Sequence, residues 1–253
     1  MLTSVIFRFS ASALCLAGLI LSSAAQADLP RTASGQPDFS GFWQTLSGAN
    51  YGLEAHGARK DAPPGPGVVD QIPYQEWALA QRDANFAERA TRDPARQCFA
   101  LGTPRGVYYP EPFQIFQRER DLTLLFQRGF RTRTIHTNES LHPEGPIGFW
   151  FGDSRAEWDG DTLVVDVVDF NGQTWLDAAG NFHGENLHVT ERWQLLDENT
   201  LQYEATLEDP DVYTKPWRLS VQLHRIREPD FQLVANTCYT LDYDRYYPIP
   251  AAE

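Results

Sequence analysis

Apolar and polar residues alternate in short runs through the second half of the chain, a pattern typical of β-strands that bury one face. Short connections separate these runs, and no helical pattern intervenes, which predicts an antiparallel meander. A meander of this length solves the problem of its exposed edges by closing into a barrel or wrapping into a sandwich. The predicted strands are 113–117, 122–127, 187–195, 201–207, 217–225 and 231–239.

The strongest turn signal is Asp159-Gly160, because this pair favours the positive backbone angles of a tight hairpin. Ala156 and Trp158 precede it and the apolar run 163–168 follows, so a hairpin is expected here. A second hairpin is expected around the polar turn 197–200, with Leu195 facing Leu201.

The part of the mature chain before residue 113 has a different pattern. A short strand is expected at 39–45, followed by a loop over 51–73 that is rich in proline and glycine. Residues 74–92 predict one amphipathic helix, which Asp93-Pro94 ends. We therefore expect an N-terminal extension, 28–112, that forms one domain with a β-barrel over 113–253.

The first 27 residues have the form of a secretory signal peptide. Arg8 is their only charged residue, an apolar run extends over 11–21, and Ala25-Gln26-Ala27 gives a small-x-small ending. The apolar run is too short for a stable membrane span. The sequence thus predicts cleavage after Ala27, a periplasmic or secreted protein, and no membrane span in the mature chain.

Charge narrows the range of partners. Removing Arg8 leaves 20 basic residues against 34 acidic ones, a net charge of −14, and the only lysines are Lys60 and Lys215. Such an acidic chain repels phosphate backbones and anionic membrane surfaces, so nucleic acid is not an expected partner.

Two cysteines remain after processing, Cys98 and Cys238. In an oxidising compartment the simplest outcome is one disulfide between them. Two buried thiols are the alternative.

Five segments carry a resemblance to a family of exported bacterial proteins without an established activity. They are Pro37–Trp43 (P-D-F-S-G-x-W), Cys98–Arg105 (C-x-x-x-G-x-P-R), Trp158–Val165 (W-x-G-D-T-L-V-V), Trp175–Arg192 (ending H-x-E-x-L-x-V-x-E-R) and Asp209–Trp217 (D-P-x-x-Y-x-x-P-W). The resemblance implies a self-contained, lipocalin-like barrel. It departs at the end of the chain, where Cys238-Tyr239-Thr240-Leu241-Asp242 replaces a C-H-E-G-N tract, which puts any shared activity in doubt.

Candidate chemistry begins with His183, Glu185 and His188. In an extended backbone His183 and Glu185 lie on one side and His188 on the other. A metal needs three or four converging ligands, and this spacing is not that of a zinc-binding helix, so ordinary hydrogen bonding is the simpler interpretation. The chain also lacks a nucleotide-binding glycine motif and a serine-hydrolase elbow, and we expect no cofactor.

The hairpin register supplies a second candidate. With Leu195 opposite Leu201, Arg192 faces Glu204 on a polar face that also carries His188. If this face lines a cavity, His188 could transfer protons and Arg192 could hold an anionic oxygen. If it faces solvent, it is an ordinary polar surface. The pattern does not decide between these two.

High aromatic content, 13% of the chain, suits a barrel core and equally a cavity for one small apolar or aromatic ligand. Trp175, Asp177, Glu204 and Trp217 are the candidate ligand contacts. Two functions follow. One is an exported enzyme of the lyase, isomerase or hydratase type that uses metal-independent acid–base chemistry on a hydrophobic or phenolic substrate, with His183, Glu185, His188 and Arg192 as the candidate catalytic residues. The other is a non-catalytic carrier or sensor for such a molecule.

Overall fold

The computed structural model describes residues 29–234, which form nine strands and two short helices. The predicted signal peptide and Cys238 lie outside the described residues. The elements are β1 (Gly41–Thr45), α1 (Glu76–Ala87), α2 (Arg89–Arg92), β2 (Phe113–Gln117), β3 (Asp121–Phe126), β4 (Arg131–His136), β5 (Asp153–Asp159), β6 (Thr162–Val168), β7 (His188–Asp197), β8 (Thr200–Glu208) and β9 (Trp217–Arg225).

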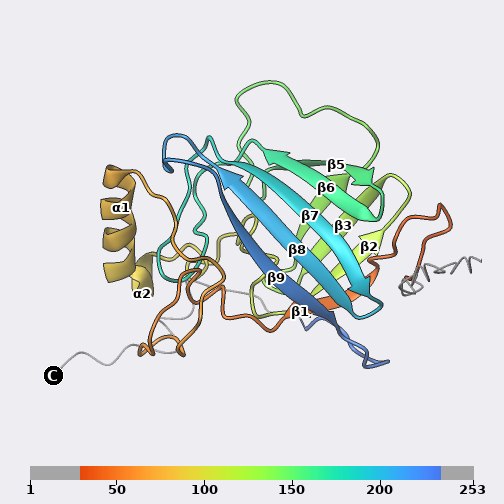
Figure 1. Cartoon of the computed structure of the whole chain (residues 1–253), viewed down its shortest axis with the longest axis horizontal. Helices are drawn as coiled ribbons and strands as arrows, with labels where there is room; N and C mark the ends of the chain where they lie inside the picture. The colour runs from red at the N-terminus through yellow and green to blue at the C-terminus, as the bar shows by residue number, and fades with distance from the viewer. Residues whose placement is uncertain (1–28, 235–253) are drawn as a thin grey trace, which may run out of the picture.

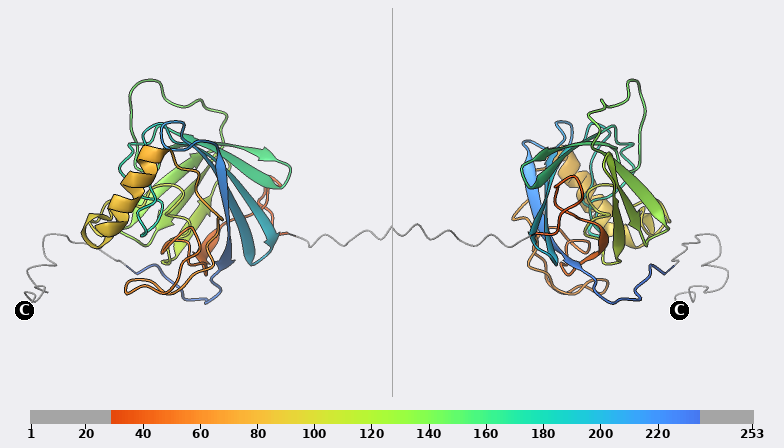
Figure 2. Two further views of the ribbon diagram at one scale, coloured as in Figure 1. Left: turned by 60° about the vertical axis from the view of Figure 1, so that its left-hand side comes forward. Right: turned by 90° about the vertical axis from the view of Figure 1, so that its right-hand side faces the viewer.

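Each strand pairs with the next, and β9 pairs back with β1, so the sheet closes into a barrel (Figure 1). The prediction of a mainly β protein with a closed barrel is confirmed. One neighbouring pair departs from a simple meander: β4 and β5 run parallel and pair only at Ile135–Ser154 and His136–Arg155. The connection between them, residues 137–152, makes the large loop that projects beyond the strands in Figures 1 and 2.

The β7–β8 hairpin has the predicted register. Leu195 pairs with Leu201, Trp193 with Tyr203, and Arg192 with Glu204. The odd-numbered positions of β7 from Val189 to Leu195 are buried and the even-numbered ones are not, so the odd face is the inside of the barrel. The Asp159-Gly160 turn also joins β5 and β6 as expected.

Large side chains fill the barrel interior. Inward-facing residues come from every part of the sheet and pack as one continuous core with an edge-to-face Trp193–Tyr203 pair at 4.7 Å between ring centroids. Members with almost no exposed surface include Trp43, Phe113, Ile115, Leu124, Leu163, Val165, Trp193, Tyr203 and Leu223.

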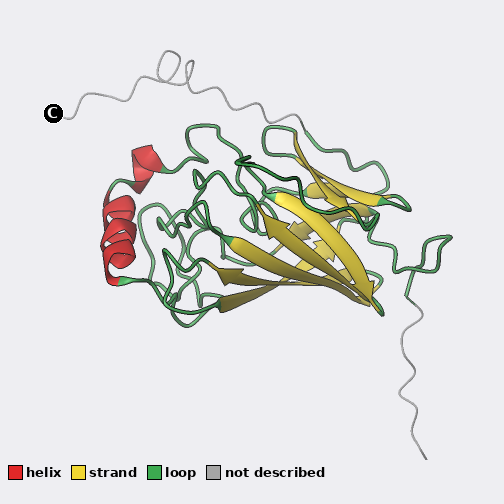
Figure 3. Cartoon of the chain, turned by 90° about the horizontal axis from the view of Figure 1, so that it is seen from above, coloured by secondary structure: helices red, strands yellow, loops and turns green. Residues whose placement is uncertain are grey.

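The N-terminal part contributes β1 to the barrel and places both helices at one end of it (Figures 1 and 3). The helix predicted over 74–92 is present but interrupted: the chain leaves helical geometry at Glu88, which divides the segment into α1 and α2. A buried ion pair ties this region to the segment before β2: Arg105 donates two hydrogen bonds of 2.8 Å to Asp93 and a third to Asn50.

The sequence pattern misses one strand and predicts another that the structure does not have. β4 was not predicted, because its sequence Arg-Thr-Arg-Thr-Ile-His has an arginine at an inward position where the pattern requires an apolar residue. Phe231–Val234, the described part of the strand predicted at 231–239, is not a strand. With β9 paired to β1, the closed sheet offers no edge at which a tenth strand could pair.

Candidate functional site

The polar face of the β7–β8 hairpin points to solvent. The Arg192 side chain is 46% exposed and pairs with Asp159 at 3.1 Å, although Glu204 is its cross-strand neighbour. Glu204 instead lies 3.5 Å from Arg218 on β9. This face therefore does not line a cavity but belongs to the outer surface of the barrel. The sequence suggested an ion pair between Arg192 and Glu204, but each of them pairs with another residue.

His188 belongs to a cluster on this outer surface. Its Nε2 contacts Asp166 on β6, and the other oxygen of Asp166 lies 2.9 Å from His142 Nε2. His142 Nδ1 in turn lies 2.7 Å from Asp153, which also accepts hydrogen bonds from Arg155. Partial burial opposes ionisation, but the hydrogen bonds from His188 and His142 outweigh it and lower the pKa of Asp166. The loop 137–152 thus brings His142 to the carboxylate that His188 on β7 also contacts.

His183 is buried and has a structural environment. Its Nδ1 donates to the Gly184 carbonyl at 2.7 Å, so Nε2 is the acceptor for the Thr174 hydroxyl at 2.8 Å. Burial lowers the pKa of His183, which keeps the ring neutral at pH 7. Glu185, two residues on, is exposed, so the two residues do not meet in one site.

Asp177 organises a loop. Its buried carboxylate accepts hydrogen bonds from the backbone N–H groups of Leu53, Ala179 and Asn181 and from the Asn181 side chain. Trp175, nearby in sequence, is largely buried and bridges to Phe182. Trp217 lies elsewhere, in a hollow beside residues 66–73, with its indole N–H buried and without a hydrogen-bond partner among the described residues. The four predicted ligand contacts are therefore not gathered in one pocket.

A charged pair inside the barrel is the main feature that the sequence did not reveal. Arg133 on β4 donates two hydrogen bonds, of 2.9 and 2.7 Å, to Glu191 on β7. Ser154 accepts from the same guanidinium, and Tyr203 donates to Glu191 at 2.7 Å. The side chains of Arg133 and Glu191 are only 1% and 0% exposed. Burial raises the pKa of Tyr203 well above its usual range, so the phenol stays protonated and donates.

Above this pair the wall of the barrel opens into an aromatic cleft. β4 pairs with β5 only at its last two residues, so residues 131–134 border a hollow of about 500 Å³. Its walls are the rings of Phe99, Phe130, Phe149, Trp150 and Phe151, and its polar edge is formed by Arg131, Thr132, Arg133 and Thr134. Phe99 and Trp150 stack at 5.1 Å between centroids, while Phe99 and Phe130 remain 43% and 44% exposed.

This aromatic cleft has the composition of a small-molecule site: mostly apolar and aromatic walls, a few polar groups at one edge, and a suitable volume. Exposed aromatic side chains that gather around one hollow also require an explanation, because isolated exposed residues are ordinary and clustered ones are not. The signal in the sequence was the run Phe149-Trp150-Phe151 next to a strand start, but only the structure brings Phe99 and Phe130 to it.

No family model matches the chain, and no curated protein matches it. Among residues 29–234, no group of three or more His, Cys, Asp or Glu side chains is placed to hold a metal ion. In the same range no helix has the length and apolar character needed to cross a membrane.

The contrast between the inner and outer ion pairs gives a stability test. Arg133→Ala should cost about 3–5 kcal/mol in the free energy of unfolding, because it leaves Glu191 buried without its counter-ion. Arg192→Ala should cost at most about 1 kcal/mol, since its pair is exposed to solvent. Urea denaturation of both variants beside the parent protein measures the difference. Equal costs would contradict the placement of these two arginines.

Proposed function

We propose that this protein binds a small hydrophobic or phenolic molecule in the aromatic cleft between β4 and β5. The observation that carries the proposal is the gathering of five aromatic rings, two of them about half exposed, around one hollow of about 500 Å³. Aromatic pairs in stacked or edge-to-face geometry gain about 0.5–1.5 kcal/mol beyond burial of their area, so a planar ligand suits these walls.

A phenolic ligand suits the cleft because the polar groups are confined to one edge. Thr132 and Thr134 offer hydroxyl groups that can both donate and accept, and the Arg131 guanidinium donates only. A ring carrying one hydroxyl group can therefore stack against Trp150 and still satisfy its oxygen at β4. The guanidinium of Arg133 is already satisfied by Glu191 and Ser154, so it supports the floor of the cleft.

The lining favours a carrier or sensor over an enzyme. Arginine and threonine are not general bases at neutral pH, because one stays protonated and the other stays un-ionised. A second candidate function, acid–base catalysis of the lyase, isomerase or hydratase type, is favoured by one observation: His142 and His188 share Asp166 on the outer surface. The chain connects the two regions directly, since Gly152 lines the cleft and Asp153 contacts His142.

We further propose that the protein is exported and belongs with the exported bacterial family that its motifs resemble. Support comes from the signal-peptide pattern of residues 1–27 and from the five motif segments that carry the resemblance. A disulfide from Cys98 to Cys238 would stabilise the folded protein mainly by restricting the conformations of the unfolded chain, as such bridges do in exported proteins.

Ligand binding can be tested with p-cresol as the probe. Trp150→Ala should weaken p-cresol binding by at least about tenfold, equal to about 1.4 kcal/mol, because it removes the ring that stacks with Phe99. Trp77→Ala is the matched control, since Trp77 is an exposed tryptophan on α1 away from the cleft. Isothermal titration calorimetry gives both affinities. The proposal fails if p-cresol does not bind, or if both variants lose affinity equally.

The catalytic candidate makes a separate prediction. If turnover depends on the cluster around Asp166, His188→Ala should lower kcat about 10²- to 10⁴-fold with ligand affinity retained. Thr190→Ala, on the same outward face of β7, should leave both quantities unchanged. Steady-state kinetics and calorimetry on the same preparations separate the two effects. Unchanged kcat in His188→Ala would remove the support for this candidate.

Export and the disulfide are tested by intact mass spectrometry of protein recovered from the periplasm or medium. The chain should begin at Asp28 and should be lighter than the reduced form by the two hydrogen atoms that one disulfide removes. A mass that includes Met1 would contradict processing, and recovery of both cysteines as thiols would contradict the bridge.

A further inference from the structure

We propose that a second cavity, at the helical end of the barrel, binds a small organic carboxylate with an aliphatic body. The cavity has a volume of about 320 Å³ and lies between the loop after Tyr51, helix α1 and the loop that contains Asn181. It is separate from the aromatic cleft, with which it shares no lining residue. The proposal therefore stands or falls independently of phenol binding.

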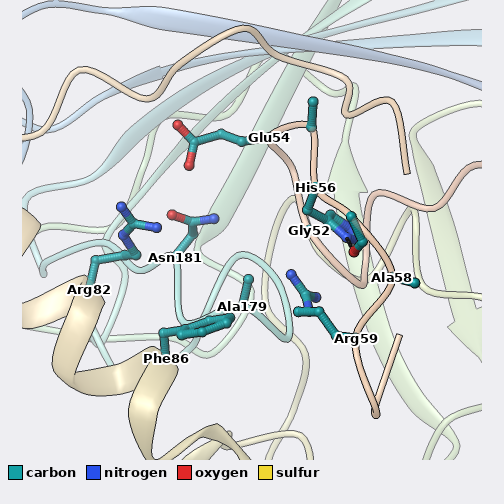
Figure 4. Close-up of a pocket in the computed structure, with 11 residues that line it drawn as sticks. Gly52, Glu54, His56, Ala58, Arg59, Arg82, Phe86, Ala179 and Asn181 are labelled. Carbon is teal, nitrogen blue, oxygen red and sulfur yellow. Dashed lines mark hydrogen bonds between the residues drawn. The ribbon is translucent and has the colours of Figure 1, made fainter. Parts of the chain in front are cut away.

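Two arginines from different elements face this cavity. Arg59 comes from the loop and Arg82 from α1, and Figure 4 shows their guanidinium groups on either side of the Phe86 ring. Their side chains are 16% and 26% exposed, so water screens them only in part. In a chain with a net charge of −13, two guanidinium groups that converge on one hollow provide a local site for an anion.

The carboxylates next to these arginines neutralise them incompletely. Asp61 lies 3.6 Å from Arg59 Nε but makes its shorter contact, 2.7 Å, with Arg89. Asp83 lies 3.2 Å from Arg82 Nε and is 65% exposed. The Nε atoms of both arginines are buried and have no hydrogen-bond partner among the described residues. Arg59 also donates from Nη2 to the Tyr51 carbonyl, whereas Arg82 makes no hydrogen bond within residues 29–234. The Arg82 guanidinium thus keeps terminal donors for a ligand oxygen, and Arg59 adds positive charge beside it.

The other residues that line the cavity determine which kind of carboxylate fits beside the arginines. Phe86, Ala55, Ala58 and Ala179 supply apolar surface, which an inorganic anion would leave uncovered. The volume suits a molecule of a few carbon atoms. Glu54 lies on the same side of the cavity as Arg82 and Asn181 in Figure 4, with one oxygen accepting from the Ile72 N–H, and its charge disfavours a ligand with a second carboxylate. A small aliphatic monocarboxylate therefore fits the apolar lining, the volume of the cavity and the negative charge of Glu54.

Butyrate is the probe, with butyramide as its neutral analogue and inorganic phosphate as the anion without a body. Calorimetry at millimolar concentrations should give saturable binding of butyrate alone. Arg82→Gln should weaken it at least about tenfold, the loss expected for a charge-assisted hydrogen bond. Glu54→Gln should tighten it, because the amide keeps an acceptor for Ile72 and removes a neighbouring negative charge.

Two control variants make the result specific. Arg118→Gln removes an exposed arginine far from the cavity lining, and Trp150→Ala alters only the aromatic cleft; both should bind butyrate like the parent. Arg82 lies on the surface of α1, so its variant should keep the parent's thermal midpoint. Absence of saturable binding, equal binding of butyramide or phosphate, or an equal loss in Arg118→Gln would each overturn the proposal.

Discussion

The ion pair between Arg133 and Glu191 crosses the inside of the barrel and joins strands that are not neighbours in the sheet. Its two charges are removed from water, so the arrangement is stable only if every donor and acceptor is satisfied. Ser154 on β5, Tyr203 on β8 and the Trp193 indole on β7 meet this requirement by hydrogen bonding to the pair. The network thereby links the four strands β4, β5, β7 and β8 across the barrel interior. Core aromatic residues pack around the network and keep water from it.

The position of this pair also explains where the barrel opens. Arg133 occupies an inward position on β4, and β5 joins β4 only beyond it, at Ile135 and His136. The parallel β4–β5 pairing needs a long crossover, and residues 137–152 provide it. The same crossover brings Phe149, Trp150 and Phe151 to the gap and His142 to Asp166. One topological feature thus creates both the aromatic cleft and the histidine cluster.

The motif residues at the helical end of the barrel serve mainly as a framework. A side chain at Gly102, where φ is +74°, would place its Cβ 2.5 Å from the Thr174 hydroxyl, which is the partner of His183. Asp209 accepts from the Gly184 N–H at 2.7 Å, and Tyr213 donates to the Phe182 carbonyl. These contacts fix loops that surround the second cavity. His183, Asp177 and Asp209 are here satisfied by backbone groups and by the side chains of Thr174 and Asn181.

Local pattern determined the parts of this protein that depend on neighbouring residues in the chain. Alternation over β7, β8 and β9 and the Asp159-Gly160 turn were enough to predict these strands, the Leu195–Leu201 register and a sheet that closes into a barrel or wraps into a sandwich. The pattern could not assign the two faces of the β7–β8 hairpin, and it passed over β4, since an inward arginine is stable only when a distant Glu191 lies opposite it. The cleft and the arginine-lined cavity likewise join residues from segments far apart in the chain. Strand order and the crossover 137–152 set those distances, so only the tertiary structure decided where the sites lie.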